Sequence, residues 1–288
     1  MNSKVKVARL SLISNSALIM LKLFVGLVTG SVSMMSEAIH STMDLLAAII
    51  AFFSVKISDK PADDLHPYGH GKVENISGVI EALLILSASI WIIVEAAKKI
   101  IKPGEMQSVG LGFIVMFISA SINYIVSRKL YKIAKAEESI ALEADALHLK
   151  ADVYTSLGVG AGLLMIYITH LTYLDPIVAI LVAIFILKEA IELLITAFNP
   201  LLDVKISDDE IKLIKKSLEK FSSVFCNYHA FKTRRSGRMK YIDMHLVFPE
   251  NMTIKEAHDI CDKIESDIGN SLKNTEVMIH IECPEDQK

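Results

Sequence analysis

Long apolar stretches dominate the first two-thirds of the chain, from about residue 10 to about residue 198. A helix needs ~20 apolar residues to cross a hydrocarbon core of ~30 Å, and a helix in a soluble core rarely needs so many. Six stretches reach this length, at residues 10–29, 32–57, 76–101, 109–130, 142–168 and 174–198. The pattern therefore predicts an α-helical membrane protein with six transmembrane helices.

Turn-forming residues separate the apolar stretches. Gly30-Ser31 predicts a tight hairpin between the first two helices, and Pro61 marks the next connection as a loop. Lys102-Pro103-Gly104 interrupts the chain between the third and fourth stretches. The first stretch is longer than the core of a signal peptide and is not followed by a convincing cleavage site, so we count it as a span.

Basic residues near the ends of the predicted spans indicate their orientation. Cytoplasmic loops of membrane proteins carry an excess of lysine and arginine. With six spans both termini lie on one side, and this side carries Lys4, Lys6, Arg9, Lys56, Lys60, Lys72, Arg128, Lys129, Lys132 and Lys135. The other side carries Lys98, Lys99 and Lys102. This asymmetry predicts a multi-pass protein of the cell membrane with cytoplasmic N- and C-termini.

After Asp203 the composition changes to that of a soluble domain. Residues 208–220 and 253–268 have helical periodicity, and Ser207 is a suitable N-cap for the first of these helices. Residues 224–233 and 240–248 alternate around a glycine-containing turn, and 276–283 form a last short strand. The order predicts an α+β unit, one sheet covered by two helices. We therefore expect two domains, residues 1–202 and 203–288.

Four ionisable residues inside the predicted spans form two matched pairs. His40 and Asp44 lie in the second span, and His148 and Asp152 lie in the fifth. The i, i+4 spacing places each pair on one helix face. Together they offer two imidazoles and two carboxylates, which suit tetrahedral zinc. An isolated polar residue in a span often serves only helix packing, but two matched pairs in separate spans favour a metal site.

Other polar residues inside the spans form no matched pair. Glu81 and Asn123 are interpreted as packing or pathway residues, and Lys22 is expected to reach a polar cavity or a partner.

Two further groups of candidate ligands lie outside the spans. Asp63, His66 and His70 follow one another in the loop after the second span and would converge if the loop curls. In the tail the candidates lie on different elements and could meet only through folding or dimerisation; they are His229, His245, His258 and His280, with Asp262, Glu282 and Cys283 nearby. The alternative for both groups is solvated surface histidine without a function.

Charge and cysteine content exclude some classes of protein. The net charge of −3 argues against a nucleic-acid partner, which would favour a basic face. The three cysteines, Cys226, Cys261 and Cys283, have no paired spacing and are interpreted as reduced cytosolic thiols.

The intramembrane pairs stand in longer motifs, namely residues 36–44 (SEAIHSTMD), 61–64 with 70–72 (PADD and HGK) and 145–152 (DALHLKAD). In this combination the chain resembles the cation diffusion facilitator family of metal/proton antiporters, over nearly its whole length. The resemblance implies six spans followed by a cytoplasmic metallochaperone-like domain, a homodimer, and transport of zinc by alternating access, with protons competing for the same ligands.

The resemblance also assigns roles to individual residues. It implies a transport site of His40, Asp44, His148 and Asp152, and a loop metal site of Asp63, His66 and His70. It implies cytoplasmic zinc sites near the dimer interface, made from His229, His245, His258, His280 and Glu282. Lys72 and Asp203 match a charge interlock between the two domains. Histidine at position 40 is typical of zinc-preferring members, so zinc is expected as transported substrate and as regulatory ion, with no organic cofactor.

Three other functions remain as alternatives. A membrane zinc enzyme would need an open coordination position and a general base, as in His-Glu-x-x-His, which does not occur in the sequence. A pure zinc sensor would not need paired ligands in two spans. Export of manganese or iron by the same fold is the nearest alternative, although carboxylate and carbonyl ligands suit manganese better than two imidazoles do.

Overall fold

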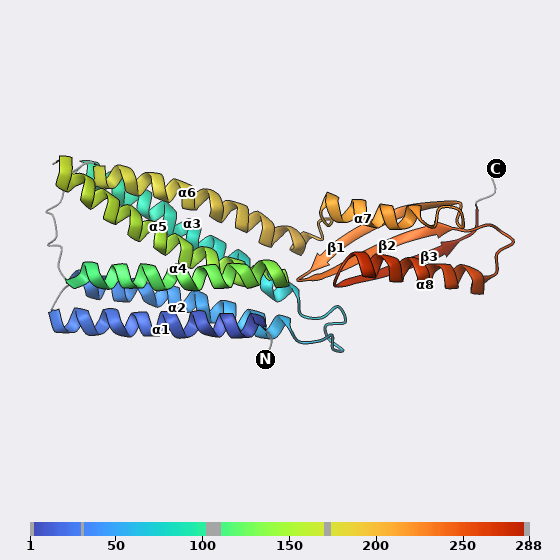
Figure 1. Ribbon diagram of the computed structural model, residues 1–288, viewed down its shortest axis with the longest axis horizontal. Helices are drawn as coiled ribbons and strands as arrows, with labels where there is room; N and C mark the ends of the chain where they lie inside the picture. Colours follow the sequence, from blue (N-terminus) through green and yellow to red (C-terminus); the bar gives the residue numbers. More distant parts are fainter. Residues whose placement is uncertain (1–2, 30–31, 102–110, 170–173, 285–288) are drawn as a thin grey trace. The chain divides into compact units, whose positions relative to one another are not determined.

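The computed structural model describes residues 3–29, 32–101, 111–169 and 174–284 (Figure 1). Within these ranges the side chains at 26, 29, 32–40, 43, 99, 111–113, 159–169 and 174–175 are outside the description. The chain divides into two compact units, residues 1–198 and 199–288.

Six α-helices make up the described part of the first unit (Figure 1). They are α1 Ser3–Thr29, α2 Val32–Ser58, α3 Lys72–Ile101, α4 Leu111–Glu137, α5 Ile140–Thr169 and α6 Leu174–Phe198. α1 packs on α2, α3 on α6, and α4 on α5, while α5 also contacts α2, α3 and α6. The fifth helix is therefore central to the unit.

The helices extend beyond the apolar stretches at several ends. α4 continues to Glu137 and α3 begins at Lys72, because lysine, glutamate and alanine form helices well without being apolar. By length and composition, two of the described helices are apolar enough to cross a membrane, over Ser3–Val25 and Lys72–Lys98. The number of six spans therefore stays a prediction.

A buried polar cluster joins the helix ends near the N-terminus. Glu74 on α3 is 3% exposed, and its Oε1 accepts hydrogen bonds from Lys4 Nζ at 2.8 Å and Ser58 Oγ at 2.7 Å. Ser139 Oγ donates to its other oxygen. Lys4 Nζ also lies 2.9 Å from Asp59 Oδ1. The cluster ties α1, the end of α2, α3 and the start of α5 together, and because each charge has partners it can be buried.

Glycine 78 lets α3 approach its neighbours closely. A Cβ at this position would lie 2.5 Å from Ile140 Cγ2 on α5 and 3.1 Å from Ala197 Cβ on α6. Any side chain larger than hydrogen would force these helices apart, because packed interiors leave little free space.

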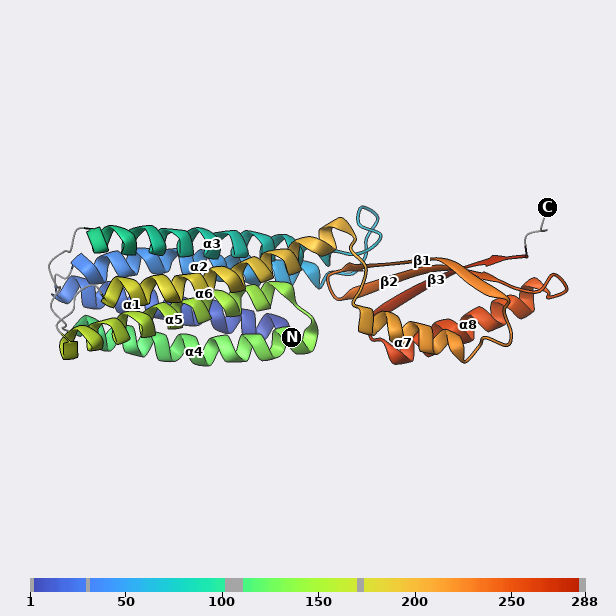
Figure 2. The same ribbon diagram turned by 90° about the horizontal axis from the view of Figure 1, so that it is seen from above.

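The second unit is a three-stranded sheet with two helices on one face (Figure 2). After the 3-10 turn η1 Asn199–Leu202 come α7 Asp208–Glu219, β1 Asn227–Ser236, β2 Met239–Val247, α8 Ile254–Ser271 and β3 Thr275–Glu282. β2 is the central strand, antiparallel to β1 and parallel to β3. The predicted α-β-β-α-β order is confirmed, and Ser207 caps α7 within a capping box.

The core of this unit lies between the sheet and the helices. It contains Ile242, Met244 and Leu246 of β2 together with Ile264 and Ile268 of α8, all at most 1% exposed. Because side chains alternate along a strand, the residues between them on β2 face the other side of the sheet. That face is left open by α7 and α8, as Figure 2 shows.

All three cysteines are free. Cys261 is buried in the core, where burial raises the pKa of its thiol to about 11. Cys226 and Cys283 are exposed.

Candidate metal centres

Three of the four predicted intramembrane ligands lie together inside the first unit. Asp44 on α2 is 8% exposed, and its Oδ1 lies 3.1 Å from Nε2 of His148 on α5. The ligand atoms of Asp44, His148 and Asp152 all lie within 4.8 Å of one another. His148 and Asp152 are one turn apart, and the contact between α2 and α5 brings them to Asp44.

His40 completes the predicted set in the sequence. It lies on α2 one turn before Asp44, but its side chain is outside the described residues. Its part in the site therefore stays a prediction.

The neighbourhood of Asp44 is polar on the α1 side as well. Lys22, which is 6% exposed, donates from Nζ to Ser41 Oγ at 2.6 Å. Asn15 Nδ2 lies 3.5 Å from the Asp44 carbonyl oxygen. The sequence left open whether Lys22 reaches a polar cavity or a partner, and the structure shows a partner on α2.

Asp145 is a buried carboxyl group that the sequence analysis did not assign to the site. It is fully buried on α5 and is close enough to Glu81 of α3 and to His148 for their charges to interact. Asp145 could have been found from its spacing to His148 and Asp152, because residues at i, i+3 and i+7 share one helix face. Glu81, interpreted as a packing or pathway residue, is also fully buried.

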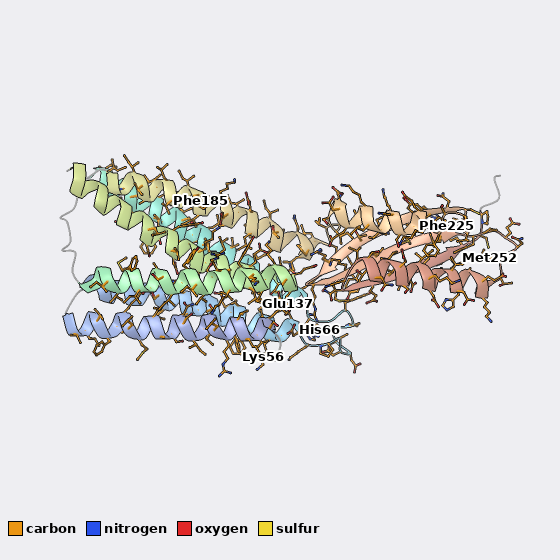
Figure 3. All side chains as sticks on the ribbon, in the orientation of Figure 1. Lys56, His66, Glu137, Phe185, Phe225 and Met252 are labelled. Atoms are coloured by element: carbon orange, nitrogen blue, oxygen red, sulfur yellow. The ribbon has the colours of Figure 1, made fainter. Side chains whose placement is uncertain are left out.

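The loop between α2 and α3 brings Asp63, His66 and His70 together. His66 Nδ1 lies 3.1 Å from Asp63 Oδ1, and His70 Nε2 lies 3.4 Å from Asp63 Oδ2. Figure 3 labels His66 in this loop. Gly69, with a φ of 75°, donates its N–H to the His66 carbonyl at 2.9 Å and turns the chain back toward Asp63.

The same loop holds its carboxylate in the charged form. The backbone N–H of His66 donates to Asp63 at 2.7 Å and lowers the pKa of this carboxyl group, and the imidazole of His66 adds to the effect. An ionised carboxylate beside two imidazoles is the form that binds a divalent cation.

In the second unit the strand register aligns three histidines. His229, His245 and His280 are direct partners across β1, β2 and β3. His245 Nδ1 lies 2.7 Å from Glu282 Oε1, and His229 Nε2 lies 3.1 Å from Glu282 Oε2. His280 Nε2 is 3.8 Å from the same carboxylate. A bulge beside His229, with Ala230 at a φ of 50°, shapes this edge.

His258 is separate from this row. It lies on α8, 3.7 Å from Asp262 one turn later. Since α8 covers the opposite face of the sheet, the fold itself does not bring His258 to the three aligned histidines. The part of His258 in a cytoplasmic zinc site near a dimer interface therefore stays a prediction.

Lys72 and Asp203 belong to different units. Lys72 is the first residue of α3, and Asp203, with a φ of 54°, lies 4.0 Å from Arg234 of β1. Their pairing stays a prediction.

Comparisons with known proteins agree with this geometry. Residues 8–202 match the cation efflux transmembrane domain, and residues 206–283 match the cytoplasmic domain of cation efflux proteins. The chain is 32% identical over 268 residues to the uncharacterized transporter sll1263 of Synechocystis, covering 93% of this chain and 86% of the relative. It is 31% identical over 287 residues to the manganese efflux system protein MneP of Bacillus subtilis, covering 96% and 95%.

A solved structure of a related cytoplasmic domain is also similar. The metal-bound C-terminal domain of the CzcD transporter from Thermotoga maritima is 28% identical, with a TM-score of 0.26, and the match covers 29% of this chain and all of that one. The two matched domains together span most of the sequence. The protein therefore belongs to the cation efflux family: it is a membrane-bound divalent cation efflux transporter with a cytoplasmic C-terminal domain, and not an enzyme.

Proposed function

We propose that the protein exports Zn²⁺ from the cytoplasm as a zinc/proton antiporter, through six transmembrane helices that work by alternating access. The observation that carries this proposal is the buried group of Asp44, His148 and Asp152, whose ligand atoms lie within 4.8 Å of one another on two helices. With His40 one turn before Asp44, the donor set becomes two imidazoles and two carboxylates. Nitrogen and oxygen donors in this number are typical of zinc.

Proton exchange follows from the chemistry of the ligands. A histidine must be neutral and a carboxylate ionised to bind a metal ion, so protons and metal compete for the same atoms. The donors come from two helices, and a relative tilt of α2 and α5 would change the distances between them. Such a tilt is the movement that we expect to release zinc to the outside.

Manganese export is the second candidate. It is favoured by the similarity to MneP, the manganese efflux system protein of Bacillus subtilis. Imidazole donors suit zinc better than manganese, which prefers carboxylate, carbonyl and water oxygen. The proposed ligand set therefore favours zinc over manganese, because His40 and His148 supply two imidazole donors.

We further propose that residues 1–202 form the transport domain, and that residues 203–288 regulate it and hold a homodimer together. The row of His229, His245 and His280 with Glu282 supports a regulatory zinc site. The loop group of Asp63, His66 and His70 supports a second one. Zinc that binds only the assembled state would stabilise it by mass action.

Metal uptake into proteoliposomes tests the proposal. Inverted vesicles containing the full chain should accumulate zinc faster than cadmium, manganese or iron, with proton movement in the opposite direction. Asp152→Asn should reduce zinc uptake by more than about tenfold, because it removes an anionic ligand without changing the shape of the side chain. Asp64→Asn in the exposed loop is the matched control. Preferred transport of manganese by the unaltered protein would overturn the assignment of zinc.

A further inference from the structure

A groove on the outer side of α5 is not used by the transport site. It has a volume of about 1060 Å³ and is bounded by α4, α5 and α6. Lys150 and Tyr154 of α5 line it, two positions after His148 and Asp152 respectively. Because two helical positions correspond to a rotation of ~200°, these side chains leave α5 on the side opposite the metal ligands. The candidate ligands Asp44, His148 and Asp152 are therefore not among the residues that line the groove.

The groove has an excess of positive charge at one end. Its acidic residues are paired: Glu143 with Lys135 at 2.5 Å, Glu189 with Lys150 at 2.8 Å, and Glu192 with Lys188 at 3.7 Å. Arg128, Lys129 and Lys132 also line the groove and are exposed. Among the residues that the structure describes, these three have no carboxylate partner.

The charged end of the groove lies at the cytoplasmic side of the membrane. α6 ends at Phe198, shortly before the match to the cytoplasmic domain begins at residue 206. The C-terminal turns of α4 and α6 line the same end of the groove, through Lys135 and Thr196. Figure 3 shows Glu137 at this end of α4.

The rest of the groove suits hydrocarbon. Val153 and Leu157 of α5 line it farther from the charged end, Leu193 of α6 adds apolar surface, and Leu157 is 58% exposed. Tyr124 and Tyr131 lie on the same face of α4 as Arg128 and Lys135, at spacings of i, i+4, i+7 and i+11. Tyrosines of this kind are enriched at the level of lipid headgroups.

We propose that this groove binds an anionic phospholipid of the cytoplasmic leaflet. Arg128, Lys129 and Lys132 would contact its phosphate, and an acyl chain would lie along the apolar wall formed by α5 and α6. Basic pockets between helices on the cytoplasmic side of a membrane are suited to such headgroups. The volume of about 1060 Å³ is slightly above the ~300–1,000 Å³ of ordinary small-molecule sites, which suits a ligand as large as a phospholipid.

A second copy of the chain fits the groove less well. In a symmetric dimer the same surface patch meets itself. The three basic side chains without carboxylate partners would then face their own copies, and like charges repel.

Photolabelling of the full-length protein tests the proposal. The protein is placed in phosphatidylcholine vesicles that contain a trace of phosphatidylglycerol with a photoreactive group in one acyl chain, and labelled peptides are identified by mass spectrometry. We expect peptides of α5 and α6, which form the apolar wall, to be labelled more by this probe than by the matching phosphatidylcholine probe. The excess of labelling by phosphatidylglycerol over phosphatidylcholine should fall by roughly fivefold or more in a triple variant with Arg128→Gln, Lys129→Gln and Lys132→Gln. This is expected because each basic side chain attracts the anionic headgroup.

A matched control removes the same number of positive charges from positions outside the groove. Arg9→Gln, Lys56→Gln and Lys60→Gln change one arginine and two exposed lysines outside the groove and should leave the labelling unchanged. Equal labelling of the unaltered protein by the two lipid probes would overturn the proposal, as would crosslinks between two protein chains in this groove. Full competition by soluble glycerol phosphate would also overturn it, because it would indicate a site for a free anion.

Discussion

Asp44 and His148 meet at 3.1 Å although they are separated by 104 residues in the chain. Each sits on a different helix, with its second candidate ligand one turn away on the same helix. The candidate site therefore has two halves on separate helices, and the distances between its donors depend on the spacing of α2 and α5. A substitution can change the candidate ligands of one helix while those of the other helix stay the same.

His40→Asp should broaden selectivity from zinc toward cadmium and manganese. The change replaces one imidazole by a carboxylate, which reduces the nitrogen donors from two to one and weakens the preference for zinc. Initial rates of zinc, cadmium and manganese uptake, compared in the variant and the unaltered protein, measure the effect. An unchanged ratio of rates would mean that position 40 does not select the metal.

Asp267 on α8 links the two helices of the cytoplasmic domain. It accepts hydrogen bonds from Lys220 Nζ at 2.7 and 2.8 Å and from Ser217 of α7. The Lys220 ammonium, followed by the Ser217 hydroxyl, holds the pKa of the Asp267 carboxyl below its usual value. A lowered pKa in the folded state stabilises fully above the unfolded-state value of ~3.9, and this stabilisation is lost as the pH falls through the folded-state pKa.

Asp267→Asn should therefore lower the thermal midpoint of a fragment of residues 199–288 at pH 7. The difference from the unaltered fragment should shrink as the pH is reduced below about 4. Asp259→Asn, at an exposed position of the same helix, is the control. A difference that stays constant over the whole pH range would assign the effect to packing and not to the charge.

At the scale of elements, α3 is held against its neighbours at Gly78. Gly78→Val should destabilise the protein in detergent by about 1–3 kcal/mol, because the new side chain meets Ile140 and Ala197. Trimming the neighbour with Ile140→Ala in the same chain should recover part of the loss. Gly269→Ala on α8, where a Cβ would meet nothing within 4 Å, should be neutral or stabilise by up to ~1 kcal/mol. Thermal unfolding of these three variants and of the unaltered protein measures the effects, and equal losses at both glycines would contradict the argument.

The elements themselves could be predicted from the sequence, because they depend on local patterns. The apolar stretches predicted the six helices, and alternation around Gly237 predicted the β1–β2 hairpin. Contacts between distant elements were harder to predict. The alignment of His229, His245 and His280 requires the parallel pairing of β3 with β2, which no local pattern encodes. Asp145 was missed because only the i, i+4 pair of His148 and Asp152 was considered on this helix, although Asp145 belongs to the same motif and the same helix face.

At the scale of the whole molecule, two units with separate cores must act together. Candidate metal ligands lie in both units, with the proposed transport site in the first and the histidine row in the second. Regulation then requires a connection between the units that transmits binding in one to movement in the other. Lys72 and Asp203 are the predicted connection.

Lys72→Ala and Asp203→Ala should each slow zinc uptake several-fold without altering a metal ligand. If the two charges interact, the double variant should be no worse than the poorer single variant. Uptake rates of the four proteins in this cycle measure the coupling, and strictly additive losses would show that the residues act independently. Arg234→Gln is a necessary control, because Asp203 lies 4.0 Å from Arg234 within the second unit.

The buried cluster around Glu74 has a consequence for how the protein is made. Glu74 contacts Lys4, Ser58 and Ser139, which leave the ribosome at very different times. A nascent chain that ends before α5 holds the Glu74 carboxylate without the Ser139 hydroxyl. The hydrogen bonds of this cluster are therefore completed only after the start of α5 has been made. Quality-control proteases should therefore recognise chains truncated before residue 139 more readily than chains truncated after α5.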